Sequence, residues 1–459
     1  MIRIDSSLTP NALRKDVERL FELSAQKIRS LEKSWNPAAG TPVFTVAGRY
    51  TSRGWTEWTQ GFQFGSMILQ FDATGDSRFL AIGRDRILRY MANHVSHIGV
   101  HDHGFNNVST YGNFHRLARE GKISAARGEI QFYELALKVS GAVQAARWTD
   151  LPDNLGYIYS FNGPHSLFAD TIRSLRALGL SHQLGHVLMG ERDRKFSLLN
   201  RLITHAETTA RYIVYFGKGR DYYDVPGRVA HEAIFNLNDG SYRCPNTQQG
   251  YSPFSTWTRG LAWILCGYAE QLEFLQTLPE SAFKTHGGKQ KVLSRFLDVA
   301  TVTADFYIKS TPVDGIPYWD TGAPGLACMG DYADRPAEPF NDYEPVDSSA
   351  AAIAAQGLIR LGNYLKSQRQ TKAGALYLAA GLTVARTLFS NTYLCTSPKH
   401  QGLILHAVYH RPNGWDYVPK GRKVPCGESC MWGDYHAREL ALLILRTARR
   451  ESYYTFFLR

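Results

Sequence analysis

Three neighbouring residues, His101, Asp102 and His103, carry side chains that could bind a metal ion. On a helix, side chains at positions i and i+2 point about 160° apart, so the two histidines could not chelate one ion. In an extended segment the histidines share a face, but Asp102 then lies on the other. No H-E-x-x-H spacing accompanies them, because the A-H-E-A-I run at 230–234 lacks a second histidine. We therefore expect no metal site in this segment.

Two interpretations of the same segment remain. In the first, His101 and His103 only cap or line the start of a helix through hydrogen bonds. In the second, Asp102 is a carboxylate placed just before a helix, held by polar neighbours and aimed into a cleft. The residue types fit both a structural and a chemical role.

A second candidate carboxylate is Asp170, in the run N-G-P-H-S-L-F-A-D-T-I-R-S-L. We predict a helix that begins at Gly163-Pro164 and holds Asp170 about one and a half turns inside it. Aspartate has a poor helix propensity, and inside a helix it is usually an exposed, neutral choice. Beside an apolar wall and a second carboxylate its pKa would instead rise, as a general acid requires.

The segment 246–263 is rich in groups that could hold a sugar acid. Gln249 lies in a glycine-containing loop, and Arg259 and Trp263 lie four residues apart on one face of the helix that follows. An arginine beside a tryptophan can grip a carboxylate and the face of a sugar together. Trp55 and Trp58 have a similar loop-to-helix setting. The alternative is that these aromatic residues belong to the core.

The six cysteines do not suggest a metal or disulfide framework. They are scattered, with one C-x3-C pair, at Cys426 and Cys430, and no C-x2-C pair. Together with His436 this pair is only a weak candidate for a metal site. We expect free thiols.

Helical periodicity must position these groups, and it predicts twelve helices without a proline- or serine-rich linker between them. Six helical hairpins closed into one ring are the simplest arrangement, which gives an all-α (α/α)6 barrel as a single domain over residues 1–459. No exact repeat supports this closure, so an open α-solenoid is the alternative. Strand-like runs at 315–320 and 403–410 are expected to form small hairpins at the mouth of the barrel, where loops build the site. The predicted helices span 10–34, 58–73, 77–94, 105–121, 125–141, 164–179, 193–213, 254–275, 290–309, 347–364, 371–390 and 431–449.

The composition is that of a globular enzyme that attracts anions. Of the 459 residues, 44% are hydrophobic and 12% aromatic, and the formal net charge is +11. Lysine and arginine are nowhere dense enough for a nucleic-acid arm, and no apolar run reaches the roughly 18 residues of a membrane span. The charged N-terminal segment lacks the apolar region of a signal peptide, so we expect a cytoplasmic protein.

Several motifs, in order along most of the chain, resemble the unsaturated glucuronyl hydrolases of glycoside hydrolase family 88 and, more distantly, the unsaturated rhamnogalacturonyl hydrolases. His231, Gln249, Arg259 and Trp263 follow one another at intervals of 18, 10 and 4 residues, as in that family. One such segment would be weak support, but all of them in order are strong support. The matching runs are W-T-Q-G-F at 58–62, H-D-H-G-F at 101–105, F-A-D-T-I-R-S-L at 168–175, S-T-W-T-R-G-L-A-W at 255–263 and W-G-D-Y-H at 432–436.

The resemblance implies an enzyme that removes a 4,5-unsaturated uronic acid from the non-reducing end of oligosaccharides left by polysaccharide lyases. Asp170 would be the general acid/base that protonates C4 and activates the water that adds at C5. Asp102 would be the partner carboxylate that positions the sugar and raises the pKa of the acid. His101 would be a hydrogen-bonding neighbour of Asp102 on the substrate side. No metal or organic cofactor is implied, and the partner is an anionic oligosaccharide.

The remaining family positions imply binding roles, and three departures are expected to affect the substrate. Trp58 and Trp263 would stack on sugar rings, while His231, Gln249 and Arg259 would bind hydroxyls or the carboxylate. The departures are Ile172-Arg173-Ser174, where the family has Met-Met-Asn, Gln63, where it has a second tryptophan, and the polar pair Asn106-Asn107. Near the pocket, Arg173 would favour a sulfated or a saturated uronide.

Three other functions compete with this hypothesis. The chain could be a glycosidase that acts on intact uronides, or a sugar epimerase on the same barrel that uses His231 and His406 as its catalytic pair. It could also be a sugar-binding module without catalysis, because a fold does not by itself fix a function. The sequence does not give the linkage, the adjacent sugar, tolerance of sulfate or the oligomeric state.

Overall fold

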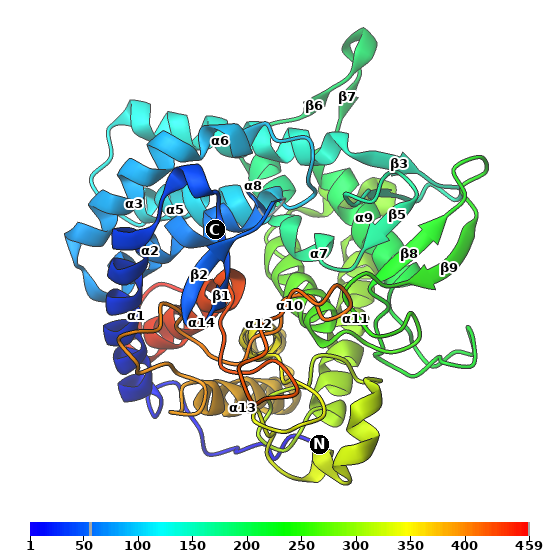
Figure 1. The fold of residues 1–459 in the computed structure, drawn as a ribbon. Coiled ribbons are helices and arrows are strands. Elements are labelled where there is room, and N and C mark those ends of the chain that lie inside the picture. The colour runs from blue at the N-terminus through cyan, green and yellow to red at the C-terminus, as the bar shows by residue number, and fades with distance from the viewer. Residues whose placement is uncertain (55–56, 458–459) are drawn as a thin grey trace.

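The computed structural model describes residues 1–54 and 57–457 and is dominated by helices, as predicted (Figure 1). Each of the twelve predicted segments contains at least one helix. The helices are α1 (Arg14–Ser34), α2 (Gln60–Thr74), α3 (Ser77–Tyr90), α4 (Ala92–Val95), the π-helix η3 (Gly104–Gly112) continuing into α5 (Asn113–Arg119), α6 (Arg127–Ala146), α7 (Thr171–Ser174), α8 (Arg176–Gln183), α9 (Leu198–Tyr212), α10 (Thr258–Leu275), α11 (Lys289–Ser310), α12 (Ser348–Ser367), α13 (Thr371–Leu388) and α14 (Met431–Ala448).

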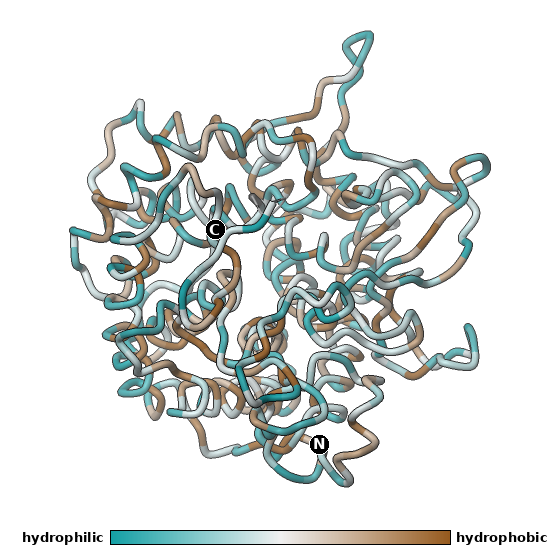
Figure 2. The backbone as a smooth tube through the Cα atoms, viewed as in Figure 1, coloured by the Kyte–Doolittle hydropathy of each residue, from teal (hydrophilic) through white to brown (hydrophobic). Residues whose placement is uncertain are grey.

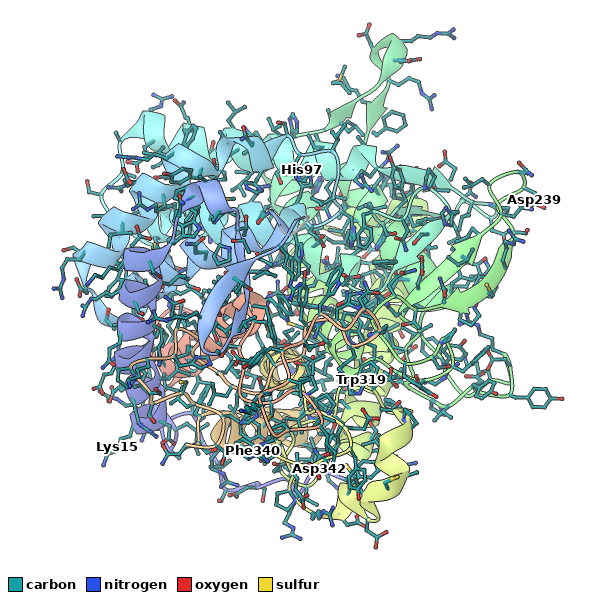
Figure 3. All side chains as sticks on the ribbon, viewed as in Figure 1. Lys15, His97, Asp239, Trp319, Phe340 and Asp342 are labelled. Atoms are coloured by element: carbon teal, nitrogen blue, oxygen red, sulfur yellow. The ribbon has the colours of Figure 1, made fainter. Side chains whose placement is uncertain are left out.

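The helices alternate between an inner and an outer position. Along the inner series α2 packs against η3, η3 against α7 and α8, α7 against α10, α10 against α12, α12 against α14, and α14 against α2. Helices α1, α3, α6, α9, α11 and α13 lie at the periphery (Figure 1). Side chains on the outer surface, such as Lys15 on α1 and Asp239 in the loop at 236–241, point away from the body (Figure 3).

The inner helices are buried on nearly all sides, and most of their residues are apolar or small. In α10 and α12 almost every residue is buried. Asp347 is the N-cap of α12, as its position predicts, and its side chain accepts the Ser349 and Ala350 amide hydrogens. Small residues let α12 and α13 approach closely: a Cβ atom on Gly362 would lie 2.8 Å from the carbonyl oxygen of Gly374.

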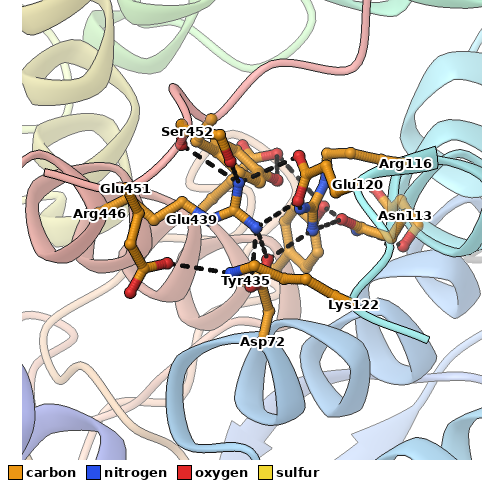
Figure 4. A network of polar contacts seen from close by, with 12 residues as sticks. Asp72, Asn113, Arg116, Glu120, Lys122, Tyr435, Glu439, Arg446, Glu451 and Ser452 are labelled. Atoms are coloured by element: carbon orange, nitrogen blue, oxygen red, sulfur yellow. Dashed lines mark hydrogen bonds and ion pairs between the residues drawn. The ribbon is translucent and has the colours of Figure 1, made fainter. Parts of the chain in front are cut away.

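Buried ion pairs link the inner helices to one another. The Asp72 carboxylate of α2 forms ion pairs with the Arg116 guanidinium of α5 at 2.7 Å and with the Arg446 guanidinium of α14 at 2.7 Å (Figure 4). A third ion pair joins it to the Lys122 ammonium at 2.9 Å. Despite burial, these cations hold the pKa of Asp72 well below its usual range. The carboxylate is therefore charged in the folded protein and joins three helices.

Short strands lie between the helices rather than in one large sheet. Three hairpins pair β1 (Pro42–Val46) with β2 (Arg49–Ser52), β3 (Trp148–Asp150) with β4 (Gly156–Ile158), and β6 (Leu188–Met189) with β7 (Lys195–Phe196). The tip of the projecting β6–β7 hairpin is hydrophilic (Figure 2). A three-stranded antiparallel sheet has the order β5 (Ser166–Phe168), β8 (Glu232–Phe235) and β9 (Tyr242–Asn246).

Two expectations about local structure were wrong. The runs at 315–320 and 403–410 form no hairpins and contribute only isolated bridges, such as Tyr318 with Val346 and Leu394 with Ile404. The helix predicted from Gly163 begins instead at Thr171, because Ser166–Phe168 forms strand β5 and pairs with β8, more than sixty residues along the chain. Asp170 is therefore at the N-cap of α7 and not inside a helix. Pairing with a distant strand outweighed the local helical pattern.

Among the described residues, none of the helices combines the length and the apolar character that crossing a bilayer requires.

Candidate active site

Asp102 and Asp170 meet where the start of η3 packs against the start of α7. The Asp102 carbonyl accepts the Phe105 amide at 2.8 Å, and Gly104 donates its amide to Ser174 Oγ at 3.0 Å. A Cβ atom on Gly104 would collide with the backbone of Ser174, so a glycine is needed for this approach. The crossing of these two segments brings the carboxylates together.

His101 lies between the two carboxylates. Its Nε2 atom is 3.4 Å from Asp102 Oδ1 and 3.8 Å from Asp170 Oδ2, and its side chain is only 1% exposed. The backbone carbonyl of His101 accepts Gln144 Nε2 at 2.7 Å and Ser174 Oγ at 3.0 Å, which holds the segment in place. Burial works against a charged imidazole, but the two carboxylates outweigh it and raise the pKa of His101.

The two carboxylates have different protonation tendencies. Burial raises the pKa of Asp102 to about 6. Burial acts on Asp170 in the same direction, but the nearby His101 and His231 rings lower its pKa below the ordinary value. The expectation that Asp102 and burial raise the pKa of Asp170 was therefore wrong in direction: in the unliganded protein the first proton goes to Asp102.

His103 does not join this group. Its Nε2 atom bonds the His97 carbonyl at 2.6 Å and its Nδ1 atom contacts Ser140 Oγ at 3.2 Å. The two histidines thus contact different partners, although residues 101 and 102 lie before the helix and the helical i, i+2 geometry does not apply to them. Among the described residues, His101, Asp102 and Asp170 are the one group of three ionisable side chains with ligand atoms within 4.8 Å of one another. Asp170, remote in sequence, takes the place that His103 cannot occupy.

A cavity of about 220 Å³ opens in front of the carboxylates. Seven of the eight predicted site residues line it, and the eighth, His231, packs directly behind, with its ring between Phe168 and Trp257 at 4.6 Å from each. Trp55 lies outside the described residues. The lining comprises Trp58, Val100, His101, Asp102, Phe105, Phe161, Asn162, Asp170, Gln248, Gln249, Trp257, Arg259, Trp263, Tyr409, His410, Asn413 and Trp415.

Arg259 is held by the protein on every side. Its Nη1 atom donates to Asp347 Oδ2 at 2.7 Å and to the Val408 carbonyl at 2.6 Å. Its Nη2 atom donates to Gln249 Oε1 and to the Tyr409 carbonyl, both at 2.8 Å. The guanidinium also lies 4.5 Å from the centroid of Trp257. Arg259 therefore fixes two walls of the cavity, the Gln249 loop and the 408–409 segment, and brings positive charge to them.

Backbone hydrogen bonds set the tautomer of His231. Its Nδ1 atom accepts the Gln248 amide at 2.9 Å and the Gln249 amide at 3.3 Å, so the ring proton is on Nε2. Burial lowers the pKa of His231 to about 4, which keeps the ring neutral. Nε2 is buried and has no hydrogen-bond partner among the described residues. His231 can thus donate a hydrogen bond without carrying charge.

The two tryptophans differ in how much surface they offer. Trp58 is partly exposed and stacks on Trp432 with centroids 5.1 Å apart. Trp263 is 2% exposed and packs on Phe105 and His436, so only a limited part of its ring reaches the cavity. The core and the binding interpretations therefore both apply to Trp263.

The three departures from the family pattern do not line the cavity. Arg173 is fully buried and pairs with Glu270 at 2.7 Å and Glu439 at 2.9 Å, which overturns its predicted role beside the substrate. Asn106 accepts the Gly61 amide at 2.8 Å, and Asn107 donates to the His94 carbonyl at 3.0 Å. Gln63 is likewise buried and accepts Gln60 Nε2. These residues shape the scaffold under the site.

Trp257 and the segment from Tyr409 to Trp415 also line the cavity, although no site role was predicted for them. Asp416 accepts the amides of Tyr409 at 2.5 Å and His410 at 3.0 Å and so folds this loop over the cavity. Only Tyr409 and His410 belong to the strand-like run at 403–410, and Pro412 and Gly414 in the rest of the segment are typical loop residues. Cys426, Cys430 and His436 form no ligand group within the described part of the chain, and all six cysteines are free, as expected.

Comparison with known proteins confirms the resemblance seen in the motifs. No protein-family model matches the sequence. An unsaturated glucuronyl hydrolase of Formosa agariphila is 24% identical over 389 residues, covering 83% of this chain and 78% of that protein. An unsaturated chondroitin disaccharide hydrolase of Streptococcus pyogenes is 24% identical over 437 residues, covering 93% of this chain and 91% of that protein.

Solved structures share the fold. A heparin-specific unsaturated glucuronyl hydrolase superposes with a TM-score of 0.70 at 20% identity, covering 96% of this chain and 100% of that one. The unsaturated glucuronyl hydrolase of a Bacillus species gives 0.66 at 21% identity, covering 94% and 97%. The relationship therefore extends over nearly the whole chain.

Proposed function

From its kinship with the unsaturated glucuronyl hydrolases, we propose that this protein is a glycoside hydrolase that removes a 4,5-unsaturated uronic acid from the non-reducing end of lyase-generated, anionic oligosaccharides. The observation that carries the proposal is that motifs far apart in the sequence come together in space. Motifs in family order, distributed from Trp58 to Trp263, meet around one cavity that contains two carboxylates. A formal charge of +11 also suits a polyanionic fragment.

In this mechanism the proton of the carboxylate pair, which rests on Asp102 in the free protein, passes to Asp170 when the sugar binds. Asp170 then transfers this proton to C4 of the C4=C5 double bond, and positive charge develops at C5 and the ring oxygen. A water molecule then adds at C5 and gives a proton back to Asp170. The resulting hemiketal opens to a ketone at C5, which leaves a hemiacetal at C1 that expels the rest of the oligosaccharide as an alcohol. No carboxylate attacks the anomeric carbon, unlike in retaining glycosidases.

Asp102 and His101 assist Asp170 in the proposal. Asp102 lies on the other side of His101 and accepts hydroxyl hydrogens of the sugar. The imidazole of His101, placed 3.4 Å and 3.8 Å from the two carboxylates, balances their charge. A buried pair of carboxylates in a low-dielectric site needs such compensation.

Each of the proposed binding residues contacts a different part of the sugar. Trp58 offers a ring face, and Trp263 closes the floor of the cavity. His231 donates a hydrogen bond from Nε2, Gln249 contributes its amide, and Arg259 supplies positive charge toward the uronate carboxylate. Because Arg259 is already held by four acceptors, it acts mainly as a fixed charge rather than as a side chain that closes on the substrate.

We also infer that the helices form a closed (α/α)6 barrel within a single domain. The contact of α2 with both η3 and α14 supports closure of the inner series, and one hydrophobic core extends from α1 to the C-terminal segment. Each inner helix has an outer neighbour, which matches six hairpins.

The test is the ultraviolet absorbance of the unsaturated uronic acid, which disappears when C4=C5 is hydrated. Disaccharides from lyase digests of glycosaminoglycans, alginate, ulvan and pectin are incubated with the protein, with D102N and D170N as matched isosteric controls. We expect loss of absorbance with at least one digest, and none with D170N. Cleavage of a chromogenic saturated glucuronide without any absorbance change would show a conventional glycosidase instead, and an unchanged signal throughout would refute the proposal.

A further inference from the structure

We propose that His101, Asp102 and Asp170 also form a zinc-binding site, and that Zn²⁺ bound there excludes the uronic acid from the cavity. The second half of this statement rests on the proposed function. The first half concerns binding alone and stands on geometry.

The spacing of the three side chains suits a tetrahedral ion. Bonds of about 2.0–2.1 Å at tetrahedral angles place neighbouring ligand atoms about 3.3–3.4 Å apart. His101 Nε2 is 3.4 Å from Asp102 Oδ1 and 3.8 Å from Asp170 Oδ2, and one ligand atom from each side chain lies within 4.8 Å of the others. Small rotations of the carboxylates would complete the geometry.

The ligand atoms are buried and have few other partners. His101 is 1% and Asp102 6% exposed, and the Asp170 side chain is 14% exposed. Both imidazole nitrogens of His101, Asp102 Oδ1 and Asp170 Oδ1 lack hydrogen bonds within the described residues. Zn²⁺ would displace the protons that His101 and Asp102 otherwise hold, and the deprotonated set of two carboxylates and a neutral imidazole has a charge of −2 that a divalent cation neutralises.

The ligand types favour zinc over magnesium or calcium. Zn²⁺ accepts both imidazole nitrogen and carboxylate oxygen as ligands, whereas Mg²⁺ and Ca²⁺ prefer oxygen ligands alone. His231 would not be a fourth ligand, because its Nδ1 atom already accepts two amide hydrogens and its Nε2 atom carries the proton. A water molecule from the cavity would take the fourth position, where a substrate hydroxyl otherwise lies.

The experiment is calorimetric titration of the full-length, metal-free protein with ZnCl₂, with MgCl₂ as the comparison ion. The H-D-H sequence supplies a matched pair: H101Q removes the proposed ligand, whereas H103Q removes a histidine that bonds His97 and Ser140. We expect one zinc per chain for the unmodified protein and H103Q, and an affinity at least about 100-fold lower for H101Q and for the isosteric D170N. Circular dichroism of each variant checks that it is folded.

A second arm measures inhibition. Zn²⁺ should inhibit loss of absorbance competitively with the disaccharide, and EDTA should restore the activity. No zinc binding by the unmodified protein, or equal affinity in H101Q and the unmodified protein, would overturn the proposal. If zinc binds with the expected pattern but no digest is hydrolysed, the zinc site stands and the proposed function fails, so the two failures can be told apart.

Discussion

Replacing Arg259 by methionine tests whether this arginine holds the cavity together or mainly grips the substrate. The substitution keeps the length and apolar body of the side chain but removes the guanidinium. Asp347, whose side chain is fully buried, then loses its ion pair at 2.7 Å, and the Val408 and Tyr409 carbonyls lose their donors. Breaking a buried ion pair by removing one partner costs about 3–5 kcal/mol, because the other charge stays buried.

Other interactions limit how far this cost can rise. Asp347 keeps four acceptor contacts through Oδ1, to the amides of Ser349, Ala350 and Val408 and to Ser349 Oγ. Tyr409 lines a cavity that water can enter. We therefore expect R259M to lower the free energy of unfolding by about 3–5 kcal/mol. The double variant R259M/D347N should recover part of this loss, since asparagine still caps α12 without a charge.

Urea unfolding followed by circular dichroism gives the stability, and absorbance assays on the same samples give kcat and KM. R259K is the matched control. It keeps one positive charge near Asp347 but loses the two-nitrogen donor geometry of the guanidinium, so its stability should lie between those of R259M and the unmodified protein. If R259M unfolds at the same urea concentration as the unmodified protein while KM rises strongly, then Arg259 acts chiefly on the substrate and the reasoning from its four acceptors is wrong.

Three further predictions follow from single residues. D170N should lower kcat by about 10²–10⁴-fold at unchanged thermal stability, as for loss of a general acid/base, and a residual kcat near the original value would exclude that role. W415A removes an aromatic wall of the cavity and should raise KM about tenfold with little change in kcat, which steady-state kinetics would contradict if kcat fell instead. Cys395 and Glu428 outweigh burial and raise the pKa of His400 to about 9, so this histidine stabilises the fold fully below pH about 6.5 and loses that contribution as pH rises through 9. Unfolding of H400Q should therefore differ from that of the unmodified protein by about 3 kcal/mol at pH 6.5 and much less at pH 9.5, and a constant difference would refute the assignment.

Much of the helical scaffold could be predicted from the sequence because helices depend on patterns among neighbouring residues. The heptad-like apolar spacing of α11, the Asp347 cap of α12 and the basic end of α14 are properties of neighbouring residues, and all appear where the pattern indicates. The ordered motifs likewise identified the related proteins.

The helix predicted through Asp170 shows where local pattern is insufficient. Leu167 and Phe168 fit a helical face, but β8 supplies backbone partners that a helix at this position would forgo. That strand lies far along the chain, so no window of neighbouring residues contains the information. As a result Asp170, the proposed general acid/base, was predicted inside a helix, whereas it lies at the N-cap of α7.

The sequence by itself determined which chemical groups the protein has and in what order, and from these the helical class, the carboxylate candidates and the kinship. Only the tertiary structure decided what each group faces. It turned Arg173 into a buried partner of Glu270 and Glu439, added the 409–415 loop to the cavity, and brought Asp170 rather than His103 beside Asp102. The physical reason is that burial, charge pairing and pKa depend on distances between segments remote in the chain, and these distances exist only after the helices have packed.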